Sequence, residues 1–511
     1  MSEEKPLDSS SVESEGARFK RLLANTSIYA LGELGLRFLT AIFTPLLTYY
    51  LAPAELGVWT LALMLFAGFS TVCGLGLHGA VTRFYYDHEF DEPAQRRFQG
   101  TALSFLLLWS LSLCLLMTWF GPALFEFAFT DLAFWPYGAF IVWMTFISIA
   151  GLIPRALWAA AERSRLFVGI NLLGSVTNLA GSLGLVIFAG LGVMGLFWGR
   201  TASLLVLAIP FTVYSVRRVG LAWNGSDLKA ALAFSLPLVP HLLAHWVLGM
   251  SDRFIIDHHY GGDGQLGDDG LSAGLRAVGL YGAAYVFINM VNMIAVSMNR
   301  AFVPQFTRAY QDHSQRPFVA RSVTYFLLAI SCTSVALAVL SPTLILVVFN
   351  ERYAAAAEFA PVLALAGLFQ GVYYIYVAGL FYFKKNTLIP VITILSGLLN
   401  VVLNLLWIPE FGLVGAAWAT FVGYVALALG VRWACRRYTR LPFETGRVGW
   451  LMFVLLSVVG LAVLLEGLLP LWWELSVKIM LLAMVPLLLH WVGFWRPEEL
   501  AWLKQRLVGS R

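Results

Sequence analysis

Residues 192–198 read GVMGLFW and residues 412–418 read GLVGAAW, so two glycines and a tryptophan recur in the same pattern about 220 residues apart. The segment before each copy also corresponds, since residues 172–178 read LLGSVTN and residues 394–400 read ILSGLLN. Repeats of this length are typical of membrane transporters built from two related halves. The pattern therefore predicts a two-lobed helical protein.

The whole chain has the composition of an integral membrane protein. Of its 511 residues, 59% are hydrophobic and only 12% are charged, and the mean hydropathy is +0.77. Soluble domains average about 25% charged residues. The first seventeen residues, MSEEKPLDSSSVESEGA, are polar and acidic, so we expect no cleaved signal peptide. The four cysteines lack paired or metal-type spacing, which predicts neither a disulfide framework nor a zinc site.

Hydrophobic segments of about 20 residues predict roughly fourteen membrane-spanning helices. They lie near 26–50, 55–80, 98–119, 134–154, 166–188, 192–215, 231–251, 278–299, 318–340, 357–382, 387–408, 412–434, 449–469 and 474–495. We expect an all-α fold with two pseudo-symmetric six-helix lobes around a central cavity, followed by two more helices. The predicted segments are an N-terminal tail (1–25), an N-lobe (26–215), a linker (216–230), a C-lobe (231–434), helices thirteen and fourteen (435–495) and a C-terminal tail (496–511).

The distribution of positive charge predicts the orientation, because lysine and arginine favour cytoplasmic loops. Roughly 28 of the 34 basic residues lie on the side of both termini, whereas the opposite loops hold only Arg253, Arg276 and Arg352. We expect a multi-pass protein of the bacterial cytoplasmic (inner) membrane with both termini in the cytoplasm. The longest external loop, 252–277, contains an acidic glycine-rich stretch at 257–271, which we interpret as a solvated insertion rather than a metal site.

Polar side chains form stripes along several predicted helices. In the first helix they recur every three or four residues: Thr26, Tyr29, Glu33, Arg37, Thr40, Thr44 and Thr48. The spacing of Glu33 and Arg37 suits either an internal ion pair or a place along a transport path, and both interpretations stay open. The seventh helix carries His241 and His245, and the eighth has polar residues at Tyr281, Tyr285, Asn289 and Asn292. Because ionisable groups are costly in hydrocarbon, we expect these faces to line the central cavity.

Several stretches carry a family resemblance: TPLLTYYLAPAELGVWTLAL (44–63), GLGLHGAVTRFYYD (74–87), LIPRALWAAAERSRLF (152–167), SDRFII (251–256) and WIPEFGLVGAAWAT (407–420). They resemble the polysaccharide transporter family, the bacterial flippases for lipid-linked oligosaccharides of the O-antigen and exopolysaccharide type. This family belongs to the multidrug/oligosaccharidyl-lipid/polysaccharide exporter superfamily. The resemblance implies a two-lobed bundle whose cavity opens alternately to each side. The insertion at 257–271 departs from the family pattern.

The charged, hydrated head of a lipid-linked oligosaccharide cannot cross hydrocarbon unaided. We predict a flippase that moves a polyprenyl-pyrophosphate-linked oligosaccharide from the cytoplasmic to the periplasmic or outer leaflet for surface polysaccharide biosynthesis. Arginines suit the pyrophosphate, and aromatic and amide groups suit the sugars. The candidates are Arg37, Arg200, Arg83 and Arg253 for the anion, Tyr281, Tyr285, Asn289 and Asn292 for the sugar, and Glu33, His241 and His245 for ion coupling.

The sequence has no GxxxxGK[ST] nucleotide-binding motif, so we expect a transporter rather than an enzyme, without a bound cofactor. Protons, sodium or the membrane potential are the candidate energy sources. Expected partners are the substrate, bilayer lipids, and the polymerase and glycosyltransferases of the same pathway, but not nucleic acid. The alternatives are a cation-coupled multidrug exporter of the same superfamily, a flippase for a lipid-linked peptidoglycan precursor, and a membrane glycosyltransferase. Intramembrane Arg37 and Arg200 argue against a cavity for cationic drugs.

Overall fold

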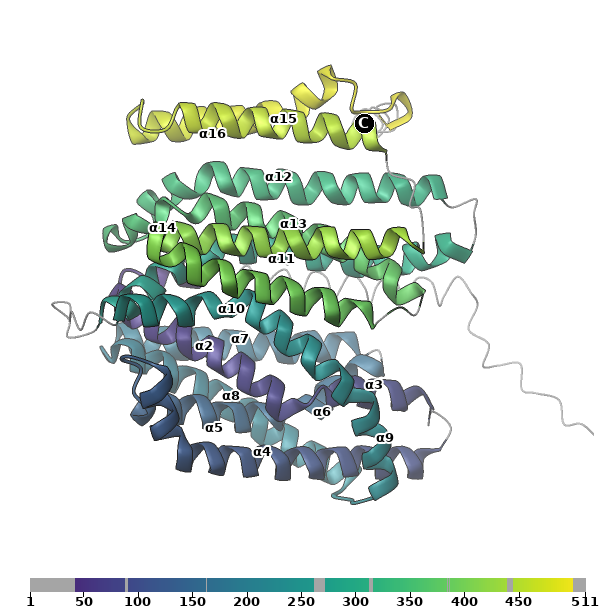
Figure 1. Cartoon of the computed structure of the whole chain (residues 1–511). Coiled ribbons are helices and arrows are strands. Elements are labelled where there is room, and N and C mark those ends of the chain that lie inside the picture. The colour runs from purple at the N-terminus through teal and green to yellow at the C-terminus, as the bar shows by residue number, and fades with distance from the viewer. Residues whose placement is uncertain are drawn as a thin grey trace, which may run out of the picture.

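The computed structural model describes residues 42–87, 91–161, 163–261, 272–311, 316–383, 385, 387–438 and 444–499. The predicted pair Glu33 and Arg37 lies outside these residues. The elements are α2 (Pro53–Gly74), α3 (Leu77–Asp87), α4 (Glu92–Ala128), η1 (Phe134–Gly138), α5 (Ala139–Ile149), α6 (Leu152–Ala160), α7 (Ser164–Ile187), α8 (Gly192–Val219), α9 (Gly225–Ser235), η2 (Leu236–Leu238), α10 (Val239–Gly261), α11 (Ala273–Gln311), α12 (Arg316–Val348), η4 (Glu351–Ala357), α13 (Ala360–Tyr382), α14 (Leu388–Arg436), α15 (Thr445–Leu464) and α16 (Leu471–Trp491). Figure 1 shows the long helices running side by side.

The described part contains 12 helices that are long and apolar enough to cross a membrane. One of them, α14, has 49 residues, or about 74 Å at 1.5 Å per residue, more than twice the bilayer core. It bends at Gly412, whose φ is 60° and ψ is −141°, and folds back on itself. A Cβ at Gly423 would lie only 3.1 Å from the Cβ of Asn400 in the other half. With α14 counted twice, the described helices match the second to fourteenth predicted spans.

The internal repeat predicted from the sequence is present in the structure. Gly192 opens α8 with a φ of 53°, and Gly412 occupies the equivalent turn with a φ of 60°. Only glycine adopts this left-handed region without steric cost, which explains why both copies keep it. The two tryptophans of the repeat, Trp198 and Trp418, are both exposed.

The helices form an N-lobe (α2 to α8), a C-lobe (α10 to α14) and a C-terminal pair (α15 and α16). In Figure 1 the pair lies on the side of α12 that faces away from the N-lobe, and both helices contact α12. Lys478 of α16 forms a buried ion pair with Glu474 at 2.6 Å and donates to Thr343 of α12 at 3.3 Å. The all-α architecture of two lobes followed by a helix pair is therefore confirmed, while most of the first predicted span lies outside the described residues.

Two predicted boundaries differ from the structure. Residues 252–261 were expected in the external loop, but α10 continues to Gly261, because Asp252 and Arg253 pair with each other inside the bundle instead of ending the helix in water. Part of the predicted linker, 216–230, is helical: α9 begins at Gly225, where the Asn224 side chain accepts two backbone N–H bonds at 3.0 Å.

Candidate functional site

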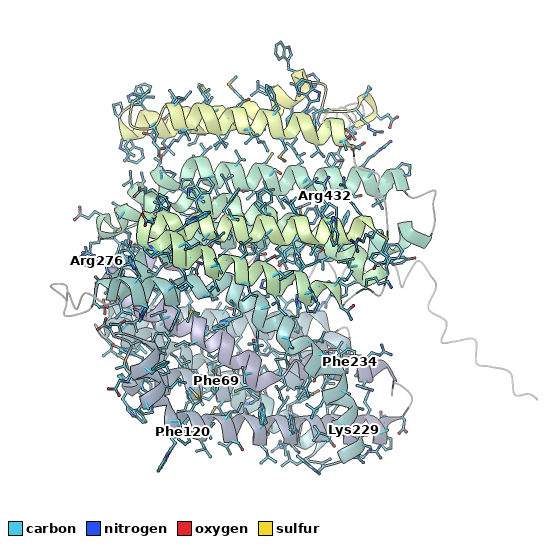
Figure 2. The ribbon with its side chains drawn as sticks, in the orientation of Figure 1. Phe69, Phe120, Lys229, Phe234, Arg276 and Arg432 are labelled. Carbon is cyan, nitrogen blue, oxygen red and sulfur yellow. The ribbon has the colours of Figure 1, made fainter. Side chains whose placement is uncertain are left out.

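The two lobes meet most closely where α2 and α11 cross. A Cβ at Gly57 of α2 would lie 1.8 Å from the carbonyl oxygen of Leu275. A Cβ at Gly279 of α11 would lie 1.8 Å from the carbonyl oxygen of Pro53. No side chain fits at these distances, so the two backbones are in direct contact. This end of the bundle, where Figure 2 also shows Arg276, is called the Gly57 end below.

Hydrogen bonds join the lobes at the same end. The Tyr353 hydroxyl, fully buried, donates to the carbonyl oxygen of Leu51 at 3.1 Å. The backbone N–H of Asn350 donates to the Thr48 hydroxyl at 3.1 Å. Thr48 and Leu51 precede α2, whereas Asn350 and Tyr353 lie between α12 and α13. The lobes are therefore in contact at the end that the charge distribution predicts to be external.

One helical segment belongs to both lobes. Its first part, α9, packs on the N-lobe, where Arg97 Nε and Asp227 Oδ2 lie 3.0 Å apart and the rings of Phe84 and Phe234 have centroids 6.5 Å apart. Its second part, α10, packs on α11 and α14 of the C-lobe. Between them, Pro237 lies in the 3₁₀ turn η2. Since proline cannot donate a backbone hydrogen bond, this turn is the natural place for the segment to bend.

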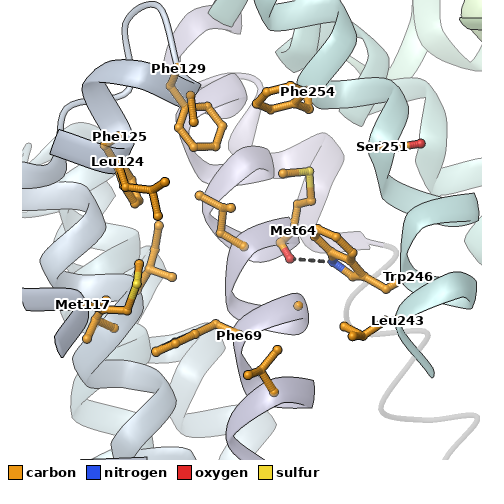
Figure 3. Close-up of a pocket in the computed structure, with 16 residues that line it drawn as sticks. Met64, Phe69, Met117, Leu124, Phe125, Phe129, Leu243, Trp246, Ser251 and Phe254 are labelled. Carbon is orange, nitrogen blue, oxygen red and sulfur yellow. Dashed lines mark hydrogen bonds between the residues drawn. The ribbon is translucent and has the colours of Figure 1, made fainter. Parts of the chain in front are cut away.

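Trp246 of α10 connects the lobes near the middle of the helices. Its indole N–H donates to the Met64 carbonyl oxygen of α2 at 2.9 Å, and the ring covers Gly68. Beside this contact is a pocket of about 470 Å³ between α2, α4, α5 and α10 (Figure 3). Aromatic side chains such as Phe69 and Phe254 line it, and no described lining residue is charged. This surface suits hydrocarbon rather than a charged head group.

The two predicted coupling histidines lie just after the break. His241 and His245 are half-buried, one turn apart on α10, and their imidazoles are near enough to interact electrostatically. Nδ1 of His241 is buried without a hydrogen-bond partner among the described residues. Both histidines therefore lie at the junction of the two lobes. Their role in ion coupling remains a prediction.

Arg253 lies inside the C-lobe rather than at a mouth of the bundle. Its side chain is 4% exposed and its Nη1 lies 2.8 Å from Asp252 Oδ1. Nη1 also donates to the Gly249 carbonyl oxygen at 2.9 Å, and Cζ lies 4.0 Å from the ring centroid of Tyr285. Every strong contact of this guanidinium is therefore made within the protein.

The predicted sugar-binding tyrosines complete the same buried network. The Tyr285 hydroxyl donates to Gly249 O at 3.0 Å, and the Tyr281 hydroxyl lies 3.1 Å from that of Thr420. The Thr420 hydroxyl in turn donates to Asp252 Oδ2 at 3.3 Å. Tyr281 is fully buried and Tyr285 is 6% exposed, so neither is accessible to a ligand in this conformation.

The two predicted asparagines of α11 are more accessible than the tyrosines. Asn289 is exposed, and Asn292 is half-buried, with Oδ1 accepting from the Tyr374 hydroxyl at 3.3 Å. An exposed amide in the middle of a membrane helix is favourable only beside water or another polar group. Along α11, burial thus gives way to accessible polar groups with distance from the Gly57 end.

Arg200 of α8 lies in the interior of the N-lobe. Its Cζ lies 5.1 Å from the ring centroid of Phe66 on α2, and its Nε is buried without a hydrogen-bond partner among the described residues. The ion pairs of the described part do not include Arg200. Within the described residues this charge is uncompensated, and such a charge in a membrane helix marks a functional site by default.

A second arginine, which the sequence interpretation missed, lies near Arg200. Arg155 of α6 donates from Nε to Gly151 O at 2.9 Å and from Nη2 to Ser148 O at 3.4 Å. Its guanidinium is near enough to Arg200 for the two charges to repel each other. Like Arg200, it has no carboxylate partner in the described ranges. Two cations in the same lobe, with no carboxylate partner in the described ranges, are candidates to bind an anionic ligand.

The remaining predicted positions among the charged residues are Arg83, Glu33 and Arg37. Arg83 is exposed on α3, and Glu33 and Arg37 fall outside the described residues. Within the described part, no group of three or more histidine, cysteine, aspartate or glutamate residues could hold a metal ion. Most of the acidic stretch 257–271 also lies outside that part.

Comparisons with known proteins agree with this architecture. A family model described as polysaccharide biosynthesis protein matches residues 46–358. The chain resembles the lipid II flippase MurJ in an inward closed conformation, with a TM-score of 0.71 and 14% identity over 91% of this chain and 98% of that chain. An inward-facing multidrug resistance MATE family transporter of the MOP superfamily has a TM-score of 0.63 and 14% identity over 80% of this chain and 100% of that chain.

One curated relative also matches. The uncharacterized membrane protein MJ1068 of Methanocaldococcus jannaschii is 23% identical over 192 residues, which are 37% of this chain and 38% of the relative. At 14% identity the solved structures show the fold, whereas the family model covers more than half of the 511 residues. The chain therefore belongs to the polysaccharide biosynthesis protein family and has the fold of MOP-superfamily transporters.

Proposed function

We propose that the protein is a flippase that moves a polyprenyl-pyrophosphate-linked oligosaccharide from the cytoplasmic to the external leaflet for surface polysaccharide biosynthesis. The observation that carries this proposal is that Arg155 and Arg200, two cations inside one membrane lobe, have no carboxylate partner among the residues that the structure describes. Family membership supports the polysaccharide pathway, and the fold supports transport by two moving lobes.

The arginine pair suits a pyrophosphate. Guanidinium groups bind phosphate oxygens through two parallel hydrogen bonds, and such charge-assisted bonds are strong where water is scarce. Binding a pyrophosphate would remove the repulsion between Arg155 and Arg200 and give the free Nε of Arg200 an acceptor. The accessible amides of Asn289 and Asn292 on the opposite lobe are the proposed sugar contacts.

Transport would follow by alternating access. In this structure α2 and α11 close the Gly57 end, which we propose is external. The bound head group would be released there when the lobes separate at Gly57 and Gly279 and the segment α9–η2–α10 bends at Pro237. Glu33, His241, His245 or the membrane potential acting on the cationic site would supply the coupling.

The similarities in fold suggest two rival substrates for the transporter. The similarity to MurJ favours a lipid-linked peptidoglycan precursor, which carries the same pyrophosphate and would use the same arginines. The similarity to MATE transporters favours a multidrug exporter, but two cations without a carboxylate partner in the described ranges would repel cationic drugs. A membrane glycosyltransferase would need catalytic carboxylates, which the described arginine site does not contain.

A deletion strain tests the proposed function. Radiolabelled or fluorescent glycan analysis should show lipid-linked oligosaccharide accumulating in the cytoplasmic leaflet, with surface polysaccharide lost and cell-wall synthesis normal. Accumulation of a peptidoglycan precursor instead would select the first rival. Unchanged glycans together with drug hypersensitivity would select the second and contradict the proposal.

A further inference from the structure

A second cavity lies between the C-lobe and the C-terminal helix pair. It has a volume of about 390 Å³ and is bounded by α12, α13, α14 and α15. Apolar side chains such as Leu327, Leu368 and Met452 line it, and Leu429 at its edge is 54% exposed. Since α15 packs on α12 and α16, the cavity is a groove that opens towards the lipid between α14 and α15.

Basic side chains gather at one end of this groove. Arg432 lines it directly, with Cζ 5.9 Å from the ring centroid of Tyr376. Arg436, one turn further along α14, is exposed, and Arg437 lies 3.8 Å from the ring centroid of Trp433. In the described ranges none of the three arginines forms an ion pair with a carboxylate.

The groove has the dimensions of one lipid chain in one leaflet. Leu368 and Tyr376 are separated along α13 by about 12 Å at 1.5 Å per residue, and half of the hydrocarbon core measures about 15 Å. Figure 2 shows Arg432 away from the Gly57 end, towards the same end as Lys229. The arginines therefore lie where a lipid phosphate would be, while the apolar groove runs towards the membrane centre.

We propose that this groove binds an anionic phospholipid of the surrounding bilayer, with an acyl chain between α14 and α15 and the phosphate on Arg432 and Arg436. Unpaired juxtamembrane arginines favour anionic over zwitterionic head groups, and tryptophan and tyrosine favour the interface. The lipid fills the space between the C-lobe and the helix pair and stabilises their association. This site is independent of the transported substrate.

Thermal unfolding of the purified full chain in detergent tests the head-group preference. Phosphatidylglycerol should raise the melting temperature at lower concentration than phosphatidylcholine with identical chains, and inorganic phosphate should have no effect. The Arg432→Gln/Arg436→Gln variant should need about 25-fold more phosphatidylglycerol, from about fivefold per basic residue. Equal protection by the two lipids, or an unchanged requirement in the variant, would overturn the proposal.

Substitutions at two glycines of α15 test whether the lipid occupies the groove. Gly449 lines it, and a Cβ there would have no atom within 4 Å, so Gly449→Leu should fill the groove without straining the protein. Gly460 is equally unobstructed but lies outside the groove, which makes Gly460→Leu the matched control. Gly449→Leu should abolish the phosphatidylglycerol effect, and Gly460→Leu should retain it. Retention in both variants, or protection by a polyprenyl pyrophosphate but not by phosphatidylglycerol, would overturn the assignment.

Discussion

Gly57 and Gly279 pack reciprocally, because each occupies a position where a single methyl group would overlap the backbone of the other lobe. Contact this close between α2 and α11 requires glycine on both sides. The contact between Gly57 and Gly279 is the part of the lobe interface with the least room for a side chain. A small increase in side-chain volume there should therefore shift the protein from the conformation closed at this end to one in which the lobes are separated.

Gly57→Val should therefore hold the lobes apart at this end. Overpacking costs about 1 to 3 kcal/mol and should shift the population by about tenfold or more towards the separated state. On a background without native cysteines, a cysteine at position 350 should react faster with an impermeant maleimide. Gly184→Val is the matched control, since a Cβ at Gly184 has no atom within 4 Å. Equal labelling of both variants would contradict this prediction.

Trp246→Phe should weaken the closed Gly57 end more mildly. It removes the hydrogen bond to Met64 O, which is worth about 1 kcal/mol, together with part of the ring that covers Gly68, so labelling at position 350 should rise at least about fivefold. Trp495→Phe, which removes a bond to Pro486 O within the C-terminal region, controls for the ring change. Labelling of Trp246→Phe at the wild-type rate would show that the indole bond does not hold the lobes together.

Arg253→Met should destabilise the protein, because it leaves Asp252 charged and buried without its partner. Removing one member of a buried pair costs about 3 to 5 kcal/mol, whereas Asp252→Asn/Arg253→Met should recover most of the lost melting temperature. A variant with the wild-type melting temperature but without substrate-induced stabilisation would instead show that Arg253 binds the substrate.

The stability of the C-terminal helix pair should depend on pH because of the carboxyl group of Glu499. Burial raises the pKa of this carboxyl, but the Arg496 N–H at 2.9 Å and the Arg447 guanidinium at 2.9 Å outweigh burial and hold the pKa below its ordinary value. The ionised form therefore contributes stability above the unfolded-state pKa of about 4.3, and this contribution is lost as pH falls through the folded-state pKa.

The melting temperature of Glu499→Gln, measured against pH, checks that prediction. The variant should melt below wild type between pH 5 and 8, by an amount corresponding to about 1 kcal/mol. The difference should shrink as pH falls below the unfolded-state pKa of about 4.3 and vanish below the lower folded-state pKa. A difference that persists at low pH would mean that the glutamate stabilises the helix pair by packing rather than by charge.

Much of the fold could be predicted because membrane spans and tight turns require particular residue types, which can be recognised in the sequence. Gly192 and Gly412 recur because the same left-handed turn occurs in each lobe, and hydropathy reports spans directly. Hydropathy failed at Asp252 and Arg253, where two adjacent charges resembled the start of a loop. Their pairing inside the C-lobe depends on tertiary packing, which the sequence pattern does not report.

In the candidate site too, some residues could be predicted from the sequence and others depend on tertiary packing. Arg200 was predicted because a lone cation in the middle of a span has no local explanation. Arg155 was missed because the preference of arginine for cytoplasmic span ends explained it without any ligand. Only the packing of α6 near α8 places both arginines in the interior of one lobe. Tertiary packing likewise decides the environment of Tyr281, whose helical face points into the C-lobe.

The most direct test of the claim that Arg155 and Arg200 bind the pyrophosphate is a flipping assay with the protein reconstituted in proteoliposomes. The measured quantity is the rate at which a polyprenyl-pyrophosphate-linked oligosaccharide becomes accessible on the opposite leaflet. Wild type and the surface control Arg217→Ala should flip it, and Arg155→Gln/Arg200→Gln should be about 100-fold slower, since each arginine contributes about 1.5 kcal/mol through charge-assisted bonds. Flipping by the double variant at the wild-type rate, with normal folding, would contradict the account.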